Sequence, residues 1–198
     1  MKNVILESYL LVSRNDEFSH RAIKDFLNND VIINIKKIIS LTGNLDESII
    51  DFILRKPEVE LIFQKRRFKS LFEHMQILSQ KSNSDFITFL HDDDLISKKY
   101  LIENYKIITK FYPDALSSSF TYIDVNNKKC KNRNRKSKKI VKRINGLISL
   151  TSFFLPFQQV IMFPTLIYKT SKLQEYWRKN VKSKNYISKS CKSGLCNN

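Results

Sequence analysis

Short apolar runs alternate with amphipathic segments over the first 125 residues of the chain. Runs rich in β-branched and aromatic residues and bounded by turn residues are typical of buried strands. Apolar residues at three- and four-residue spacing are typical of helices. On this basis we predict five strands, at residues 9–12, 31–40, 59–63, 86–90 and 115–125.

Four amphipathic segments fill the intervals between these strands, and we predict a helix in each. Ser19 is a candidate N-cap for the first helix and Ser97 for the fourth, because short polar side chains bond the free amides of a first turn. Asn44 or Asp46 takes this place in the second. The predicted apolar faces are Ala22, Ile23, Phe26 and Leu27; Ile49, Ile50, Ile53 and Leu54; Phe68, Leu71, Phe72, Met75 and Leu78; and Leu101, Tyr105, Ile108 and Tyr112.

The alternation of strands and helices predicts an α/β protein, in which helices cover both faces of a mostly parallel sheet in a three-layer, Rossmann-like arrangement. The run at 86–90 is apolar on both faces, which places it near the centre of the sheet. In such sheets ligands bind outside the carboxyl ends of the strands. We therefore expect a site where Ser13–Asp16, the turn at Gly43 and the residues after Leu90 meet.

Three consecutive aspartates, Asp92, Asp93 and Asp94, follow His91 directly after this central strand. One interpretation is a solvated turn, since Asp is common in turns and helix caps. The other is a site for a hard cation such as Mg²⁺ or Mn²⁺, which prefers carboxylate ligands and can in turn hold a phosphate. The buried strand before the aspartates favours the cation site.

Composition points to a globular intracellular protein. The chain has 198 residues, of which 42% are hydrophobic, and this is enough for one domain with a core. Its first residues lack the apolar stretch of a signal peptide. Three cysteines, an odd number in polar surroundings, support neither a disulfide framework nor a zinc site. These features predict a cytoplasmic location.

The positive charge is concentrated in the last third of the chain. Residues 1–125 carry 17 Lys and Arg against 18 Asp and Glu, whereas residues 126–198 carry 18 against one. A basic region of this kind binds nucleic acid, an anionic membrane leaflet, or nothing specific. The apolar run at 147–163 is interrupted by Pro156, and we predict core strand and loop there, with an interfacial segment as the alternative.

Three motifs in order resemble those of the family-2 glycosyltransferases of the GT-A fold. Val12-Ser-Arg-Asn15 resembles the opening Pro-Thr-Tyr-Asn, and the segment 39–48 resembles the second strand and turn, Val-Asp-Asp-Gly-Ser-Thr-Asp-Glu-Ser. Phe89-Leu-His-Asp-Asp-Asp-Leu95 resembles the metal motif Phe-Leu-Asp-x-Asp-Asp-Leu. Together they span residues 4–125, and we expect residues 1–125 to form a nucleotide-sugar-binding domain. Residues 126–198 would form a basic loop and an incomplete acceptor-side region.

The resemblance implies an inverting, metal-dependent glycosyltransferase. Its donor would be a nucleoside-diphosphate sugar, and its acceptor a saccharide or lipid-linked molecule of surface polysaccharide synthesis, with a possible peripheral contact at the inner membrane face. It implies that Asp93 and Asp94 hold Mg²⁺ or Mn²⁺. The residues implied to contact the nucleotide sugar are Ser13, Arg14, Asn15, Gly43, His91 and Asp92.

The chain also departs from the family pattern. Leu41 stands where an Asp usually recognises the base, and His91 stands where the first Asp of the metal motif usually lies. No acidic general base is evident, since Asp124 is a weak candidate and Glu175 is the only later acid. The end of the chain resembles a truncated form. We therefore expect weak or no transfer, and the alternatives are an inactive, binding-only member of the fold or a basic nucleic-acid-binding protein.

Overall fold

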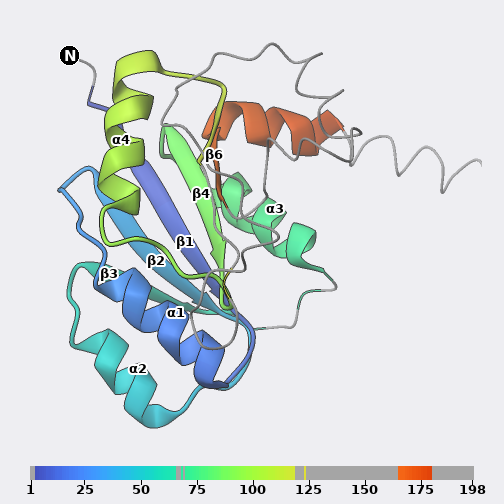
Figure 1. The fold of residues 1–198 in the computed structure, drawn as a ribbon. Coiled ribbons are helices and arrows are strands. Elements are labelled where there is room, and N and C mark those ends of the chain that lie inside the picture. Colours follow the sequence, from blue (N-terminus) through green and yellow to red (C-terminus); the bar gives the residue numbers. More distant parts are fainter. Residues whose placement is uncertain (1–2, 66–67, 69, 119–122, 124–164, 180–198) are drawn as a thin grey trace, which may run out of the picture.

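The computed structural model describes residues 3–65, 68, 70–118, 123 and 165–179 (Figure 1). The strands are β1 (Leu6–Val12), β2 (Ile35–Leu41), β3 (Val59–Phe63), β4 (Phe86–His91), β5 (Ala115–Ser117) and β6 (Leu166–Lys169). The helices are α1 (Glu17–Leu27), α2 (Glu47–Leu54), α3 (Leu71–Lys81) and α4 (Tyr100–Phe111). Residues 170–179 are also helical.

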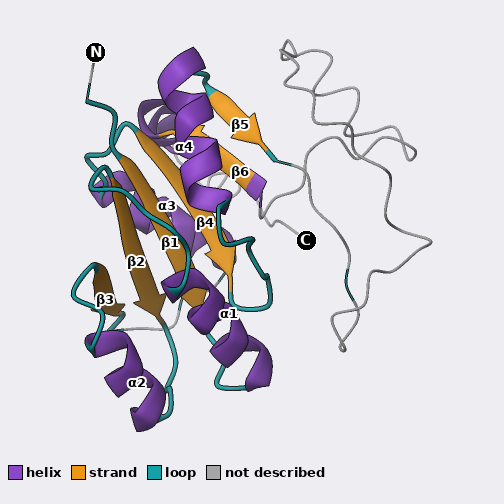
Figure 2. Cartoon of the chain, turned by 60° about the vertical axis from the view of Figure 1, so that its left-hand side comes forward, coloured by secondary structure: helices purple, strands orange, loops and turns teal. Residues whose placement is uncertain are grey.

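The strands form one six-stranded sheet in the order β3-β2-β1-β4-β6-β5. The pairs β1–β2, β1–β4 and β2–β3 are parallel, so these four strands end at the same edge (Figure 2). β4 lies in the middle, between β1 and β6. The predicted α/β class, the mostly parallel sheet and the central place of the run at 86–90 are confirmed.

Helices cover both faces of the sheet, and two hydrophobic clusters separate the three layers. On one face Phe26 of α1, Ile53 of α2 and Leu101 of α4 pack against the strands. On the other, Met75 of α3 and Leu173 of the helix at 170–179 do so, and Figure 1 shows these two helices on that face. β1 is buried at every residue, as expected for a parallel strand covered on both sides.

β6 is a strand that the sequence pattern did not indicate. It pairs antiparallel with β4 on one side and with β5 on the other, and the Thr88 hydroxyl donates to the Leu166 carbonyl at 2.9 Å. The sheet therefore contains one strand, β6, from the part of the chain after residue 125, beside the strands that precede it. The predicted strand at 115–125 is confirmed only over β5, since residues 119–122, 124 and 125 lie outside the described residues.

Two of the predicted helix caps were wrong. The N-cap of α1 is Asp16, and Ser19 is the third residue of the helix, where the two side chains form a capping box. The N-cap of α4 is Lys99 rather than Ser97. Because α1 begins three residues earlier than predicted from Ser19, only a short loop, residues 13–15, joins the end of β1 to the helix.

Several predicted features fall outside the described residues: the cysteines, Asp124, the basic run at 128–143 and the apolar run at 147–163. Within the described ranges, none of the helices combines the length and the apolar character that crossing a membrane requires.

Candidate functional site

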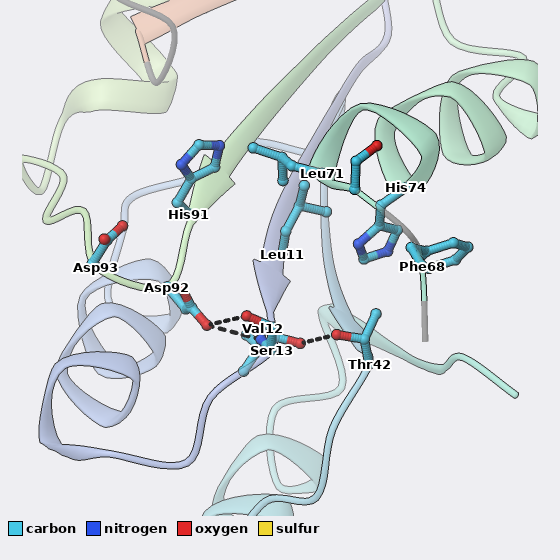
Figure 3. Close-up of a pocket in the computed structure, with 11 residues that line it drawn as sticks. Leu11, Val12, Ser13, Thr42, Phe68, Leu71, His74, His91, Asp92 and Asp93 are labelled. Carbon is cyan, nitrogen blue, oxygen red and sulfur yellow. Dashed lines mark hydrogen bonds between the residues drawn. The ribbon is translucent and has the colours of Figure 1, made fainter. Parts of the chain in front are cut away.

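A pocket of about 390 Å³ opens where the carboxyl ends of β1, β2 and β4 meet the start of α3 (Figure 3). This volume lies in the range of small-molecule sites, and its position is the sheet edge expected from the sequence. The lining residues are Leu11, Val12, Ser13, Thr42, Phe68, Ser70, Leu71, His74, His91, Asp92 and Asp93.

Asp92 fastens the loop after β1 to the end of β4. Its Oδ2 accepts hydrogen bonds from the backbone amides of Ser13 at 2.8 Å and Arg14 at 3.1 Å, and from the Ser13 hydroxyl at 3.2 Å. Its Oδ1 accepts from Arg14 Nη2 at 3.0 Å. Asp92 is only 6% exposed, and this carboxylate holds Ser13 and Arg14 in place; Figure 3 shows its bonds to Ser13.

Gly43 brings the turn after β2 against the same loop. A Cβ atom at this position would lie 2.9 Å from the Ser13 carbonyl oxygen, closer than real Cβ contacts allow. The Thr42 amide and hydroxyl both donate to the Val12 carbonyl, at 2.9 and 3.2 Å. The structure therefore gives Gly43 a packing role beside the pocket.

The side chain of Asn15 joins the starts of α1 and α2. Its Nδ2 donates to Asp46 Oδ1 at 2.8 Å, and its Oδ1 lies 2.8 Å from His20 Nε2. Asp46 is the N-cap residue of α2, as predicted, although its side chain makes no capping bond. The amide of Asn15 thus fixes the loops at the edge of the site, and it is not among the residues that line the pocket.

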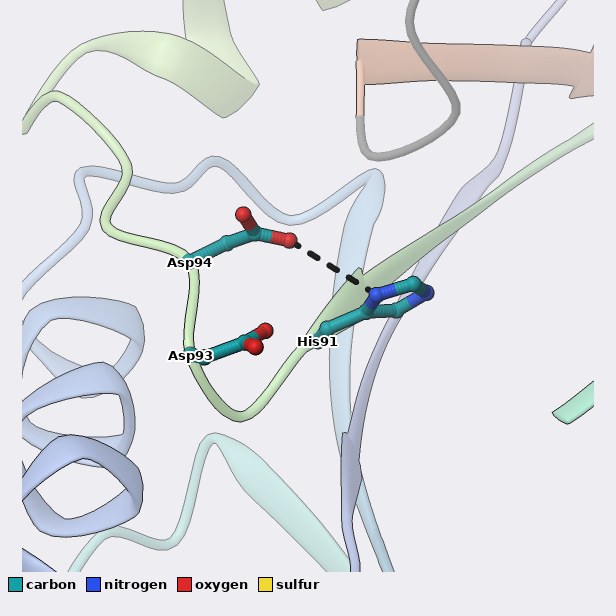
Figure 4. Close-up of side chains that lie close together, drawn as sticks. All are labelled: His91, Asp93 and Asp94. Atoms are coloured by element: carbon teal, nitrogen blue, oxygen red, sulfur yellow. Dashed lines mark ion pairs between the residues drawn. The ribbon is translucent and has the colours of Figure 1, made fainter. Parts of the chain in front are cut away.

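His91, Asp93 and Asp94 form a cluster able to hold a cation. One ligand atom from each lies within 4.8 Å of the others (Figure 4), and His91 Nδ1 is 3.8 Å from Asp94 Oδ2. Asp93 is 57% exposed, whereas Asp94 Oδ2 is buried without a hydrogen-bond partner among the described residues. The structure thus brings His91 together with the two aspartates predicted to bind metal.

Burial raises the pKa of the Asp94 carboxyl, the charges of Asp93 and Asp92 add to the shift, and His91 opposes it. A nearby positive charge stabilises the ionised form of a carboxylate in this setting. Carboxylate oxygens suit Mg²⁺ and Mn²⁺, and an imidazole nitrogen suits transition metals. The donor set, and the Asp94 oxygen that lacks a hydrogen bond within the described residues, therefore fit a divalent ion.

His74 forms the floor of the pocket, a role that we did not predict. It is 4% exposed, and its Nε2 lies 2.8 Å from Ser40 Oγ, which also accepts from Gln64 Nε2 at 2.7 Å. The ring of Phe68 stacks on it, with centroids 4.2 Å apart. Burial lowers the pKa of His74 to about 4, so the ring is neutral near pH 7. Its helical spacing indicated only a structural residue.

Two further residues bear on the predicted departures from the family. Leu41 is 3% exposed and packs in the core, so it is not placed to contact a ligand in the pocket. Glu175 lies on the helix at 170–179, where it pairs with Lys179 at 2.6 Å and Lys172 at 3.8 Å. Its neighbour Lys179 lowers the pKa of the Glu175 carboxyl.

Comparisons with known proteins give matches at the level of structure. No protein-family profile and no curated protein matches the sequence. The structure of S. aureus TarS 1–349 in complex with UDP-GlcNAc matches with a TM-score of 0.59 at 11% identity, covering 87% of this chain and 47% of TarS 1–349. A second crystal structure of TarS 1–349 matches with a TM-score of 0.57 at 12% identity, covering 87% of this chain and 49% of TarS 1–349.

The chain has a GT-A glycosyltransferase fold. At this level of identity the likeness shows the fold, and the chain spans about half the length of the TarS fragment that it matches. A looser match, with a TM-score of 0.46 at 9% identity over 58% of this chain and 35% of the other, is the mannosyltransferase PcManGT from Pyrobaculum calidifontis in complex with GDP-Man and Mn²⁺.

Proposed function

We propose that this chain binds a nucleoside-diphosphate sugar together with a divalent cation and is built to transfer the sugar to an acceptor. The observation that carries the proposal is that a pocket with an aromatic floor and a three-ligand cation cluster share His91 and Asp93 at one sheet edge. This edge is where sheets of this class bind ligands.

The floor of the pocket is the proposed place of the base. The ring of Phe68, stacked on the buried and neutral His74, offers a flat apolar surface, and Thr42 and Ser70 line the same space. Because Leu41 packs in the core, base recognition in this chain rests on these groups rather than on a carboxylate at position 41. This arrangement accounts for one departure from the family pattern.

The diphosphate would lie at the rim, next to His91, Asp93 and Asp94. A divalent cation held by these three residues supplies charge that stabilises the leaving diphosphate. Asp92 acts on the protein side, because its four hydrogen bonds fix Ser13 and Arg14 at the entrance. In this proposal Asp93 and Asp94 serve the cation, while Asp92 positions the loop.

Transfer of the sugar also requires a group that activates the acceptor. Direct displacement by an acceptor hydroxyl would invert the anomeric centre and needs a general base, for which Asp124 stays a candidate. The ion pairs of Glu175 with Lys172 and Lys179 favour the second candidate function, a donor-binding chain that transfers poorly. A turnover assay against lipid-linked acceptors separates the two, since full-rate transfer would exclude the binding-only form.

A role in surface polysaccharide synthesis on the cytoplasmic face is part of the same proposal. The basic run at 128–143 would then contact the anionic inner leaflet, where each basic residue contributes roughly 1 kcal/mol. Co-sedimentation with phosphatidylserine vesicles should fall as salt rises or as anionic lipid is removed. Equal binding to neutral vesicles would refute the membrane contact.

The experiment that tests the proposal is a calorimetric titration of the chain with UDP- and GDP-sugars, with and without Mn²⁺. We expect binding that strengthens when Mn²⁺ is present. Duplex DNA at two salt concentrations is titrated alongside, because phosphate contacts would make such binding strongly salt-dependent. Salt-dependent DNA binding in the absence of any nucleotide-sugar binding would overturn the proposal.

A further inference from the structure

One positive charge faces three carboxylates at the rim of the pocket. Arg14 Nη2 lies 3.0 Å from Asp92 Oδ1 and 3.5 Å from Asp93 Oδ2, and Arg14 Nε lies 3.9 Å from Asp16 Oδ2. The Arg14 side chain is 41% exposed, so ligands that enter the rim reach it. Asp93 is also one of the three residues that could hold a cation. The guanidinium therefore neutralises part of the negative charge of the proposed metal site.

The two main contacts of Arg14 differ in strength. Asp92 is buried, holds the Arg14 backbone amide as well as the guanidinium, and forms the shorter ion pair. The pair with Asp93 is longer and exposed on both sides, and exposed pairs of this kind contribute little. The contact with Asp92 therefore anchors the side chain, while the contact with Asp93 is the one that a ligand can exchange.

We propose that Arg14 balances the charge of Asp93 in the ligand-free protein and binds the donor diphosphate when cation and nucleotide bind together. The inference rests on the proposed function. A divalent ion on Asp93 repels the guanidinium, and an incoming diphosphate offers it a new anionic partner. Arg14 thereby weakens binding of the cation alone and strengthens binding of cation with diphosphate, which ties the two ligands to each other.

The proposal predicts effects of opposite sign in one variant. In Arg14→Gln, Mn²⁺ alone should bind about two- to five-fold tighter, because the competing charge of an exposed ion pair is gone. UDP at saturating Mn²⁺ should bind about ten-fold weaker, because a charged hydrogen-bond donor is lost. A residue that merely held the loop would weaken both ligands when replaced.

The test is a pair of titrations on the 198-residue chain, Mn²⁺ alone by calorimetry or electron paramagnetic resonance and UDP at saturating Mn²⁺ by calorimetry. Arg14→Lys keeps the charge and should lie between wild type and Arg14→Gln in both. Arg55→Gln, on the exposed C-cap of α2, makes the same change in net charge and should match wild type. Thermal melts check that each variant is folded.

The outcomes separate this inference from the proposed function. If wild type binds neither Mn²⁺ nor UDP, the proposed function fails, and the role of Arg14 fails with it. If wild type binds both but Arg14→Gln leaves Mn²⁺ affinity unchanged or lowers it, only the role of Arg14 is overturned. If Arg55→Gln reproduces the effects of Arg14→Gln, the cause is net charge, and the inference is likewise refuted.

Discussion

The polar groups on the floor of the pocket are hydrogen-bonded to one another, whereas those at the rim are charged and in part lack hydrogen bonds within the part of the chain that the structure describes. On the floor, His74 lies under the ring of Phe68 and is hydrogen-bonded to Ser40, which also accepts from Gln64. At the rim, the carboxylates of Asp93 and Asp94 lie close together beside His91. Asp94 Oδ2 has no hydrogen-bond partner among the described residues. Because the polar groups of the floor are neutral and hydrogen-bonded, the floor is a preformed surface for a flat ligand. The charged rim, in contrast, is stabilised most when a cation binds.

Asp92 stands between these two regions and belongs to the framework, so replacing it should have the largest effect on folding. Asp92→Ala leaves the amides of Ser13 and Arg14 and the guanidinium without their acceptor. We expect the free energy of unfolding to fall by about 4 kcal/mol. Urea denaturation followed by circular dichroism measures it, and a loss below about 1 kcal/mol would show that water replaces the carboxylate easily.

The neutral floor predicts a loss of stability in acid. Burial lowers the pKa of His74 from 6.5 to about 4, so between these pH values the unfolded chain binds more protons than the folded one. Stability that is present above pH 6.5 should therefore fall as the pH decreases towards 4, by at most about 3 kcal/mol. The difference between wild type and His74→Gln across this range isolates the effect, and a constant difference would contradict a neutral His74.

The histidine at the rim predicts a preference among metals. His91→Asp replaces an imidazole by a carboxylate at the position where the family motif has an Asp, and carboxylates suit Mg²⁺ as well as Mn²⁺. We expect the ratio of Mn²⁺ to Mg²⁺ affinity to fall about ten-fold, which corresponds to about 1.4 kcal/mol. Competition of the two ions in a fluorescence or calorimetric titration measures the ratio. An unchanged ratio would remove His91 from the ligand set.

The smallest expected effect is on the stability of Asp93→Asn. Asp93 is 57% exposed and its ion pair with Arg14 is long, while the adjacent aspartates repel it. We expect the free energy of unfolding to change by less than about 0.5 kcal/mol. Beside Asp92→Ala in the same denaturation experiment, this variant shows whether two neighbouring aspartates have separate roles. Equal losses in both would abolish the distinction between framework and rim.

The sequence was enough to predict the layers, and it predicted a site at the sheet edge where the pocket lies. The apolar run at 86–90 and the alternation around it predict a mostly parallel sheet, and its parallel strands β1, β2, β3 and β4 end at one edge. β6 escaped prediction because it lies apart from the strand–helix alternation, and its pairing with β4 joins distant parts of the chain.

The division of labour among the three aspartates could not be predicted for a related reason. Asp92 is set apart by bonds to Ser13 and Arg14, which are 79 and 78 positions away, and no local pattern encodes such contacts. His74 was missed because a histidine on the buried face of a helix looks structural. Only the fold reveals that this face of α3 also borders the pocket.

The most direct test of the account is the Mn²⁺ dependence of UDP binding in wild type and Asp93→Asn, measured by calorimetry on folded protein. Exposed Asp93 is proposed to serve the cation rather than the framework. The account predicts that Mn²⁺ strengthens UDP binding by wild type about ten-fold or more and has no such effect on Asp93→Asn. Equal strengthening in both proteins, or none in wild type, would contradict a cation site at the rim.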